Sequence, residues 1–188
     1  MKIIIVSAPS GSGKTSIVKY LLKHLPELDF SVSATSRLPR KGEIDGKDYY
    51  FLSAEEFRTK IDKREFVEWQ EVYSGTFYGT LRGEINRIWD MGRHIIFDVD
   101  VKGGLKLKAE FSEKALALFI KPPGITELRE RLIKRGTDIP SEIDMRIRKA
   151  KKEMNEAPHF DRVIINDNLD RACREALDIC RDFLAKKA

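Results

Sequence analysis

Short runs of apolar residues alternate along the chain with longer stretches in which apolar residues recur every three or four positions. The first pattern predicts buried strands, and the second predicts helices that cover them. Strands are expected at Lys2–Ser7, Phe30–Ala34, Tyr49–Leu52, Phe66–Val72, His94–Val99, Ala115–Ile120 and Arg162–Ile165. Because the strongly apolar strands alternate with helices, we expect an α/β fold with a parallel sheet flanked by helices.

Capping residues, glycines and prolines mark the expected helix ends. Ser53 with Glu56, and Ser141 with Asp144, have the spacing of a capping box, and Thr80 is a further candidate cap. Helices are expected at Lys14–His24, over about ten residues after Ser53, and at Thr80–Met91, Gly104–Phe111, Ile125–Arg135, Ser141–Glu156 and Leu169–Leu184.

Two stretches interrupt the alternation of apolar strands and helices. Residues 32–81 combine several short strands with one helix, and residues 123–154 are helical and heavily charged. We therefore expect a core formed by residues 1–31, 82–122 and 155–188. Residues 32–81 are predicted to project from this core as a small mixed α/β subdomain, and residues 123–154 as a helical lid.

Composition is typical of a soluble globular protein. The 188 residues are 41% hydrophobic and 35% charged, which suits a folded domain with a sizeable core. The longest apolar runs, such as Ile3–Val6, are far too short to span a membrane. The first residues lack the basic stretch and cleavage site of a signal peptide, so we expect a cytoplasmic protein.

The formal net charge of +5 favours anionic partners. The charged residues are spread along the chain and do not form a tail, and basic residues do not interleave with aromatic ones. We therefore expect neither a nucleic acid nor a membrane as a partner. The sequence does not distinguish a monomer from a homodimer.

The segment from Ala8 to Thr15 reads APSGSGKT and lies between the first predicted strand and the first predicted helix. This is the context of a phosphate-binding P-loop. Gly11 and Gly13 let the backbone turn its N–H groups toward phosphate, and the helix N-terminus adds its positive end. Lys14 is expected to reach the β- and γ-phosphates of a nucleoside triphosphate, and the Thr15 hydroxyl to bind Mg²⁺. The residues expected to hold the triphosphate are Ser10, Gly11, Ser12, Gly13, Lys14, Thr15 and Ser16.

Asp98 and Asp100 lie at the end of the predicted strand His94–Val99. In parallel α/β sheets, ligand sites lie at the carboxyl ends of the strands. A carboxylate at this position can hold Mg²⁺ directly or through water, and Asp98 is the expected metal ligand beside Thr15. Alternatively, one of the two aspartates caps the following helix.

Four further segments resemble guanylate kinases, and the resemblance extends over nearly the full length of the chain. These segments are SVSATSRLPR at 31–40, GKDYYF at 46–51, FVEW at 66–69 and YGT at 78–80. The resemblance implies a P-loop NTPase-type fold in which residues 32–81 form the GMP-binding subdomain. It also implies Mg²⁺-dependent transfer of the terminal phosphoryl group of ATP to GMP, and to dGMP, within purine nucleotide metabolism.

The resemblance also assigns residues to the acceptor site. Arg37 and Arg40 lie three residues apart, and their planar guanidinium groups suit a dianionic phosphate. A carboxylate such as Glu68 accepts hydrogen bonds from N1–H and N2–H₂ of guanine, whereas adenine turns an acceptor toward it. The resemblance places Arg37, Arg40, Tyr49 and Tyr78 on the acceptor phosphate, and Ser33, Glu68, Thr80 and Asp100 around the guanine.

Arginines in the charged stretch are candidates for neutralising phosphate charge. The attacking phosphate oxygen is already ionised, so the obstacle is to bring two polyanions together rather than to remove a proton. Arg131 and Arg135 share a helix face, and residues 130–137 resemble the lid of the family, with Arg146 as its third arginine. The residues expected to be catalytic are Lys14, Arg37, Arg131, Arg135 and Arg146.

The site for adenine has weaker support. Asn166 and Asp167 resemble the family motif near the base of ATP, but they equally fit a turn that caps the final helix. The sequence departs from the family at Ala8, where the strict P-loop has glycine, and at Lys102, where glutamine is usual. Two alternative functions stay open: a P-loop kinase for another small phosphorylated acceptor, and a non-catalytic module that binds partner peptides. The intact P-loop and the lid arginines favour catalysis.

Overall fold

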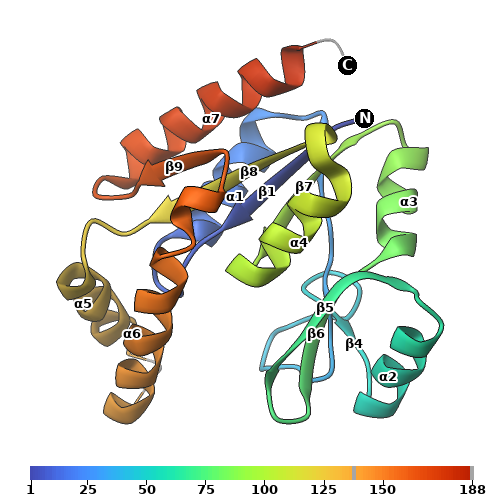
Figure 1. Ribbon diagram of the computed structural model, residues 1–188, viewed down its shortest axis with the longest axis horizontal. Coiled ribbons are helices and arrows are strands. Elements are labelled where there is room, and N and C mark those ends of the chain that lie inside the picture. Colours follow the sequence, from blue (N-terminus) through green and yellow to red (C-terminus); the bar gives the residue numbers. More distant parts are fainter. Residues whose placement is uncertain (137–138, 187–188) are drawn as a thin grey trace.

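The chain forms two sheets, as the computed structural model shows (Figure 1). It passes from the first sheet to the second between β2 and β3, and it returns after β6. The structure describes residues 1–136 and 139–186. Within these two ranges, it does not describe the side chains of Tyr73 and Arg135. All neighbouring strands of the first sheet, the core sheet, run parallel, as the sequence predicts. In spatial order its strands are β2 (Leu28–Phe30), β7 (His94–Val99), β1 (Ile3–Ser7), β8 (Ala115–Lys121) and β9 (Arg162–Ile165).

Helices cover both faces of the core sheet. In the described residues the α-helices are α1 (Lys14–His24), α2 (Ala54–Asp62), α3 (Arg82–Asp90), α4 (Val101–Phe111), α5 (Ile125–Arg135), α6 (Pro140–Met154) and α7 (Leu169–Ala185). Successive side chains of β1 point to opposite faces of the sheet. Ile4 and Val6 pack with α1 and α7, whereas Ile3 and Ile5 pack with α3 and α4. This double coverage explains why β1 reads as an unbroken apolar run. No described helix is long and apolar enough to cross a membrane.

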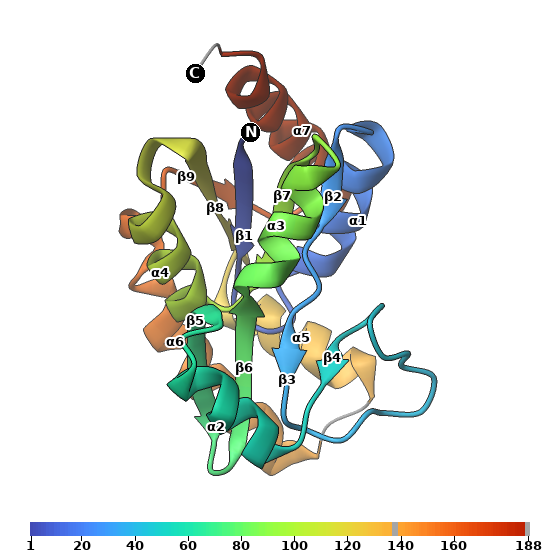
Figure 2. The ribbon, with the colours of Figure 1, turned by 90° about the vertical axis from the view of Figure 1, so that its right-hand side faces the viewer.

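The register of the core sheet brings the P-loop next to the predicted acidic residues. Val6 of β1 is paired with Asp98 of β7, and Ser7 is paired with Val99. The segment after β1 therefore emerges beside the end of β7. Helices α5 and α6 and the second sheet all project beyond this end of the core (Figures 1 and 2).

The second sheet has its own small core. In spatial order its strands are β4 (Tyr50–Phe51), β3 (Ala34–Thr35), β6 (Thr76–Leu81) and β5 (Phe66–Tyr73). Helix α2 packs on this sheet through Phe57, which stacks on Phe66 and Phe77. A capping box formed by Ser53 and Glu56 starts α2, as the sequence predicts.

Helices α5 and α6, in the stretch predicted to form a lid, share a separate apolar cluster. Leu128 and Leu132 of α5 pack against Ile143 and Ile147 of α6. The predicted cap of α6 is wrong, because the helix begins at Pro140 and not after Ser141. Proline suits the first helical position because its missing N–H needs no partner there.

One predicted strand and one predicted helix cap are wrong. Residues Phe30–Ala34 do not form one strand: β2 ends at Phe30, β3 begins at Ala34, and the chain crosses between the sheets in the intervening residues. Thr80 does not cap a helix, because it lies in β6, and α3 begins at Arg82. Strand β6 was not predicted, because Gly79 interrupts its apolar pattern. Glycine is required there, since a Cβ on Gly79 would lie 2.7 Å from the Glu68 backbone oxygen.

The start of α4 also differs from the prediction. The helix begins at Val101 instead of Gly104, and the Asp100 side chain caps it by accepting a hydrogen bond of 2.8 Å from the Gly103 N–H. The alternative that one of the two aspartates caps the next helix is therefore confirmed for Asp100. Helix α6 ends at Met154, two residues before the predicted end.

Candidate functional site

Two glycines in the left-handed conformation shape the P-loop between β1 and α1. Gly11 and Gly13 have φ angles of +89° and +88°, which favour glycine over residues with a side chain. Helix α1 begins at Lys14, so its unpaired N–H groups face the loop. The departure at Ala8 leaves this geometry intact, because its φ angle is not positive and its methyl group is buried in the core.

The side chain of Asn166, which follows β9, binds the backbone of the P-loop. Its side-chain amide donates a hydrogen bond of 2.7 Å to the Ser12 carbonyl and occupies the space next to Gly13. The interpretation of Asn166 and Asp167 as the cap of the final helix is wrong. Asn168 caps α7 instead, because its side chain accepts a hydrogen bond from the Arg171 N–H.

Lys14, Thr15 and Asp98 meet at the carboxyl end of β7. Lys14 Nζ forms an ion pair with Asp98 and donates a hydrogen bond of 2.9 Å to the Val99 carbonyl. The Thr15 hydroxyl donates to Asp98 Oδ2 over 3.3 Å. Among the described residues, no three side chains of histidine, cysteine, aspartate or glutamate form a metal site. The Thr15 and Asp98 oxygens nevertheless fit Mg²⁺, which is commonly held by one or two protein oxygens, phosphate and water.

Two pockets meet at this cluster. One, of about 880 Å³, follows the P-loop from Ala8 to Ser16 and extends to Arg131 of the lid. The other, of about 290 Å³, lies against Glu68, Tyr78 and Arg40. Because they share lining residues, ligands in the two pockets would touch at a common boundary. The residues that line both pockets are Lys14, Ser33, Tyr49, Asp98, Asp100, Arg146 and Lys149.

The smaller pocket contains a buried carboxylate. Glu68 of β5 is 6% exposed, and its Oε1 accepts a hydrogen bond of 2.9 Å from the Thr80 hydroxyl. Burial raises the pKa of Glu68 to about 7, with the Thr80 hydrogen bond opposing this rise and the charge of Asp100 adding to it. The carboxylate thus gains and loses its charge near neutral pH.

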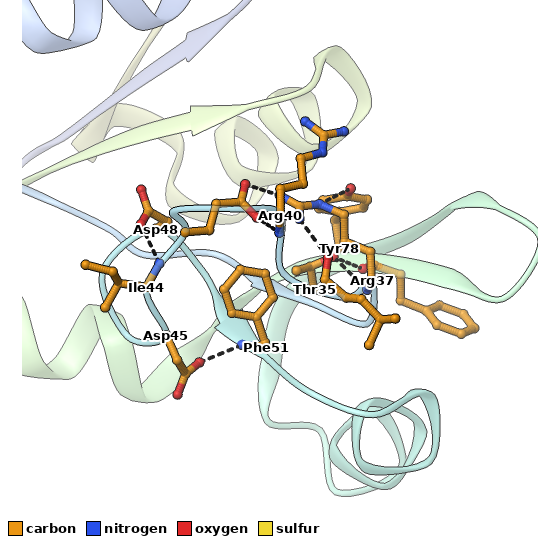
Figure 3. A network of polar contacts seen from close by, with 11 residues as sticks. Thr35, Arg37, Arg40, Ile44, Asp45, Asp48, Phe51 and Tyr78 are labelled. Atoms are coloured by element: carbon orange, nitrogen blue, oxygen red, sulfur yellow. Dashed lines mark hydrogen bonds and ion pairs between the residues drawn. The ribbon is translucent and has the colours of Figure 1, made fainter. Parts of the chain in front are cut away.

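The Arg37 guanidinium binds the Glu43 carboxylate and Tyr78 (Figure 3), and Arg37 itself is not among the residues that line the two pockets. Its two terminal nitrogens each donate a hydrogen bond of 2.6 Å to one oxygen of Glu43, and its Nε donates to the Tyr78 hydroxyl over 3.2 Å. The guanidinium lies 4.8 Å from the centre of the Tyr49 ring. Arg37 lowers the pKa of Glu43 to about 2. Arg40 donates its backbone N–H to Glu43 over 2.7 Å, and its side chain extends away from that carboxylate, although its charge also lowers the pKa of Glu43.

Glu43 was missed by the sequence analysis. It lies in the same loop as Asp45 and Asp48, and no sequence pattern distinguishes the three carboxylates. In the structure, Asp45 and Asp48 accept hydrogen bonds from the backbone N–H groups of Phe51 and Ile44 (Figure 3). Only their folded geometry separates the carboxylate that contacts Arg37 from the two that shape the loop.

Two of the predicted lid arginines face the P-loop. Arg131 donates a hydrogen bond of 2.8 Å to the Asn166 carbonyl, and Arg146 donates one of 3.1 Å to the Ser10 hydroxyl. Arg135 ends α5, but its side chain lies outside the described residues. Lys102, the second departure from the family pattern, is exposed in the first turn of α4.

Comparison with known proteins agrees with this geometry. A family profile described as guanylate kinase matches residues 1–182. The chain is 52% identical to a guanylate kinase of Bacteroides fragilis over 97% of this chain and 90% of that protein. It is 48% identical to a guanylate kinase of Porphyromonas gingivalis over 98% of this chain and 99% of that protein. The crystal structure of guanylate kinase from Anaplasma phagocytophilum superimposes with a TM-score of 0.79 at 30% identity, covering 99% of this chain and 87% of that one.

Proposed function

Because the chain belongs to the guanylate kinase family, we infer that it transfers the terminal phosphoryl group of ATP to GMP and so forms ADP and GDP. One structural observation supports this inference most strongly. The pocket around the buried Glu68 shares its boundary with the pocket along the P-loop. A guanine nucleotide and a triphosphate could therefore meet at their phosphate groups.

Guanine selection is assigned to Glu68. When ionised, its carboxylate accepts hydrogen bonds from N1–H and N2–H₂ of guanine, while the Ser33 and Thr80 hydroxyls and Asp100 complete the pocket around the base. Adenine would direct an acceptor nitrogen at the same carboxylate, which disfavours its binding. The proposed contacts involve the base and the phosphate but not the ribose 2′-hydroxyl, so dGMP should also be an acceptor.

The acceptor phosphate is assigned to Arg37, Arg40, Tyr49 and Tyr78. The bidentate contact of Arg37 with Glu43 supports this role, because a phosphate offers the same pair of oxygens to the fork. Arg40 and Tyr78 line the same pocket as Glu68. This arrangement would orient an acceptor oxygen toward the P-loop.

The donor phosphates are assigned to the P-loop residues from Ser10 to Ser16, with Lys14 reaching the β- and γ-phosphates. We propose that Thr15 and Asp98 hold Mg²⁺, directly or through water, and that the ion neutralises phosphate oxygens when bound. The hydrogen bond from Asn166 to Ser12 supports a role in holding the P-loop. Contact of Asn166 and Asp167 with the adenine stays a prediction.

Phosphoryl transfer between these sites requires charge neutralisation rather than a base. The attacking oxygen of GMP is already ionised, and the cations Lys14, Arg131 and Arg146 would offset the charge of the phosphates. Arg135 stays a predicted member of this group. Residues 123–154 and 32–81 each enclose a separate apolar cluster. This supports the proposal that they close as units over the core and exclude water.

A panel of acceptors tests the function. Purified protein is given ATP with GMP, dGMP, AMP, UMP or a ribose phosphate, with and without Mg²⁺, and ADP formation is measured. GMP should be the best acceptor, dGMP should be accepted, and activity should disappear without Mg²⁺. A better acceptor than GMP would indicate another P-loop kinase, and no ADP formation with any acceptor would indicate a binding module.

The same proposal suggests the cytoplasm as the location. Cys173 and Cys180 are both free thiols in the structure, which fits a reducing compartment. Fractionation of the source cells with an antibody to the protein would test this location.

A further inference from the structure

Helix α6 presents a second basic residue to the place where the two pockets meet. Arg146, Lys149 and Glu153 follow one another at spacings of three and four residues, so they share one face of the helix. Among the described residues, three basic side chains line both pockets: Lys14, Arg146 and Lys149. Lys14 belongs to the P-loop and Arg146 to the lid arginines, but neither the sequence pattern nor the family resemblance assigns a role to Lys149.

Glu153 holds Lys149 near the phosphate site. Lys149 Nζ lies 3.6 Å from Glu153 Oε1, and the two side chains are 50% and 14% exposed. Burial raises the pKa of Glu153, and the charges of Asp100 and Lys14 also act on it. Glu153 therefore lies within electrostatic range of both residues. The Lys149 side chain thus lines the pocket boundary, pairs with Glu153 and remains half exposed to solvent.

The neighbouring lysines of α6 differ from Lys149. All three lysines are exposed, but Lys151 and Lys152 line neither pocket. They have the same charge on the same helix, but neither contributes to the lining of the pockets. A place at the pocket boundary therefore does not follow from basic character alone, because of these three lysines only Lys149 lines the pockets.

We propose that Lys149 is a further catalytic residue, whose ammonium group contacts the phosphoryl group as it passes from ATP to GMP. This inference rests on the proposed function. In the step, a GMP phosphate oxygen forms a bond to the γ-phosphorus, the bond from that phosphorus to the β–γ bridging oxygen breaks, and its electron pair stays on ADP. Lys149 donates hydrogen bonds to the transferring oxygens and keeps its protons. A lysine suits this role because its compact charge on a flexible stem can follow the moving group.

Three variants test the proposal: Lys149→Met, Lys149→Arg and, as the matched control, Lys152→Met. Steady-state rates are measured with ATP and the best acceptor of the panel, and Tm is recorded for each variant. Lys149→Met should lower kcat by on the order of 10-fold to 100-fold, with both KM values changed by less than about threefold. Lys149→Arg should regain most of the lost kcat, and Lys152→Met should match the parent protein.

Several results would overturn the inference. A kcat for Lys149→Met within about twofold of the parent value would remove Lys149 from the chemical step. A rise in KM at constant kcat would show a role in binding alone. Equal defects in Lys149→Arg and Lys149→Met would show that the positive charge is not what acts. Because all variants are compared with an active parent protein, these results are distinct from a parent that phosphorylates no acceptor, which would refute the proposed function itself.

Discussion

The Thr80 hydroxyl donates a hydrogen bond of 2.9 Å to the buried Glu68 carboxylate, across directly paired positions of β5 and β6. This contact gives the carboxylate one fixed partner and leaves its second oxygen beside Gly103. The strand pairing thus orients the group that we assign to guanine. Since burial raises the pKa of Glu68 to about 7, guanine binding should depend on pH in the physiological range.

The affinity for GMP should increase as the pH rises through the pKa of Glu68. Only the ionised carboxylate of Glu68 accepts from both guanine donors, so KM for GMP should fall by about tenfold between pH 6 and pH 8. The GMP phosphate also titrates near this range. Glu68→Gln serves as the control, because it retains the phosphate contribution but lacks the carboxylate. Equal pH profiles for the parent protein and Glu68→Gln would refute this prediction.

Arg37 offers a test of the phosphate fork. Arg37→Lys keeps the positive charge but removes the planar pair of donors, so KM for GMP should rise by roughly 10-fold or more, with a smaller change in KM for ATP. Steady-state kinetics with each nucleotide varied in turn would measure this. Arg162→Lys, at an exposed position of β9, is the matched control. A change in KM for ATP alone would place Arg37 in the donor site.

Glu84 should stabilise the junction between the core and the second sheet. It is 4% exposed and accepts hydrogen bonds from the Val32 N–H at 3.0 Å, the Tyr50 hydroxyl at 2.9 Å and the Arg87 guanidinium at 2.8 and 2.9 Å. Glu84→Ala leaves these donors without their acceptor and should lower the free energy of unfolding by about 2–4 kcal/mol.

Urea unfolding at pH 7 would measure the effect of Glu84→Ala. The control is Glu110→Ala, which removes an exposed ion pair with Arg82 at 3.6 Å and should change stability by less than about 1 kcal/mol. A loss in Glu84→Ala no larger than in Glu110→Ala would show that the buried network does not stabilise the junction.

The lid arginines should act on turnover. Arg131→Ala, Arg135→Ala and Arg146→Ala should each lower kcat by on the order of 100-fold, because each removes a cation that offsets phosphate charge in the transition state. Arg148→Ala is the control, since Arg148 is exposed on α6 and lines neither pocket. Near-normal turnover in one of the three variants would exclude that arginine from the mechanism.

The core sheet and the P-loop could be predicted from the sequence because their signals are local. An apolar run such as Ile3–Val6 indicates a strand buried on both faces, and the sequence Gly13-Lys14-Thr15 indicates a phosphate loop at a helix start. Helix α1 was predicted with its observed bounds. The guanylate kinase resemblance was also available from the sequence, because it depends on short motifs in a fixed order and not on their spatial contacts.

The partners of the site residues were decided only by the tertiary structure. The sequence does not show that Asn166 reaches Ser12, that Thr80 donates to Glu68, or that Lys149 faces the pocket boundary. In each case the contact depends on a strand pairing, a crossing segment or a helix face that brings distant residues together. The sequence alone thus determined the family and most elements of the core sheet and its helices, because their patterns are local, but not β6 or the break between β2 and β3. Only the tertiary structure determined which charged groups face one another, because these contacts depend on how all helices and strands of the chain pack together.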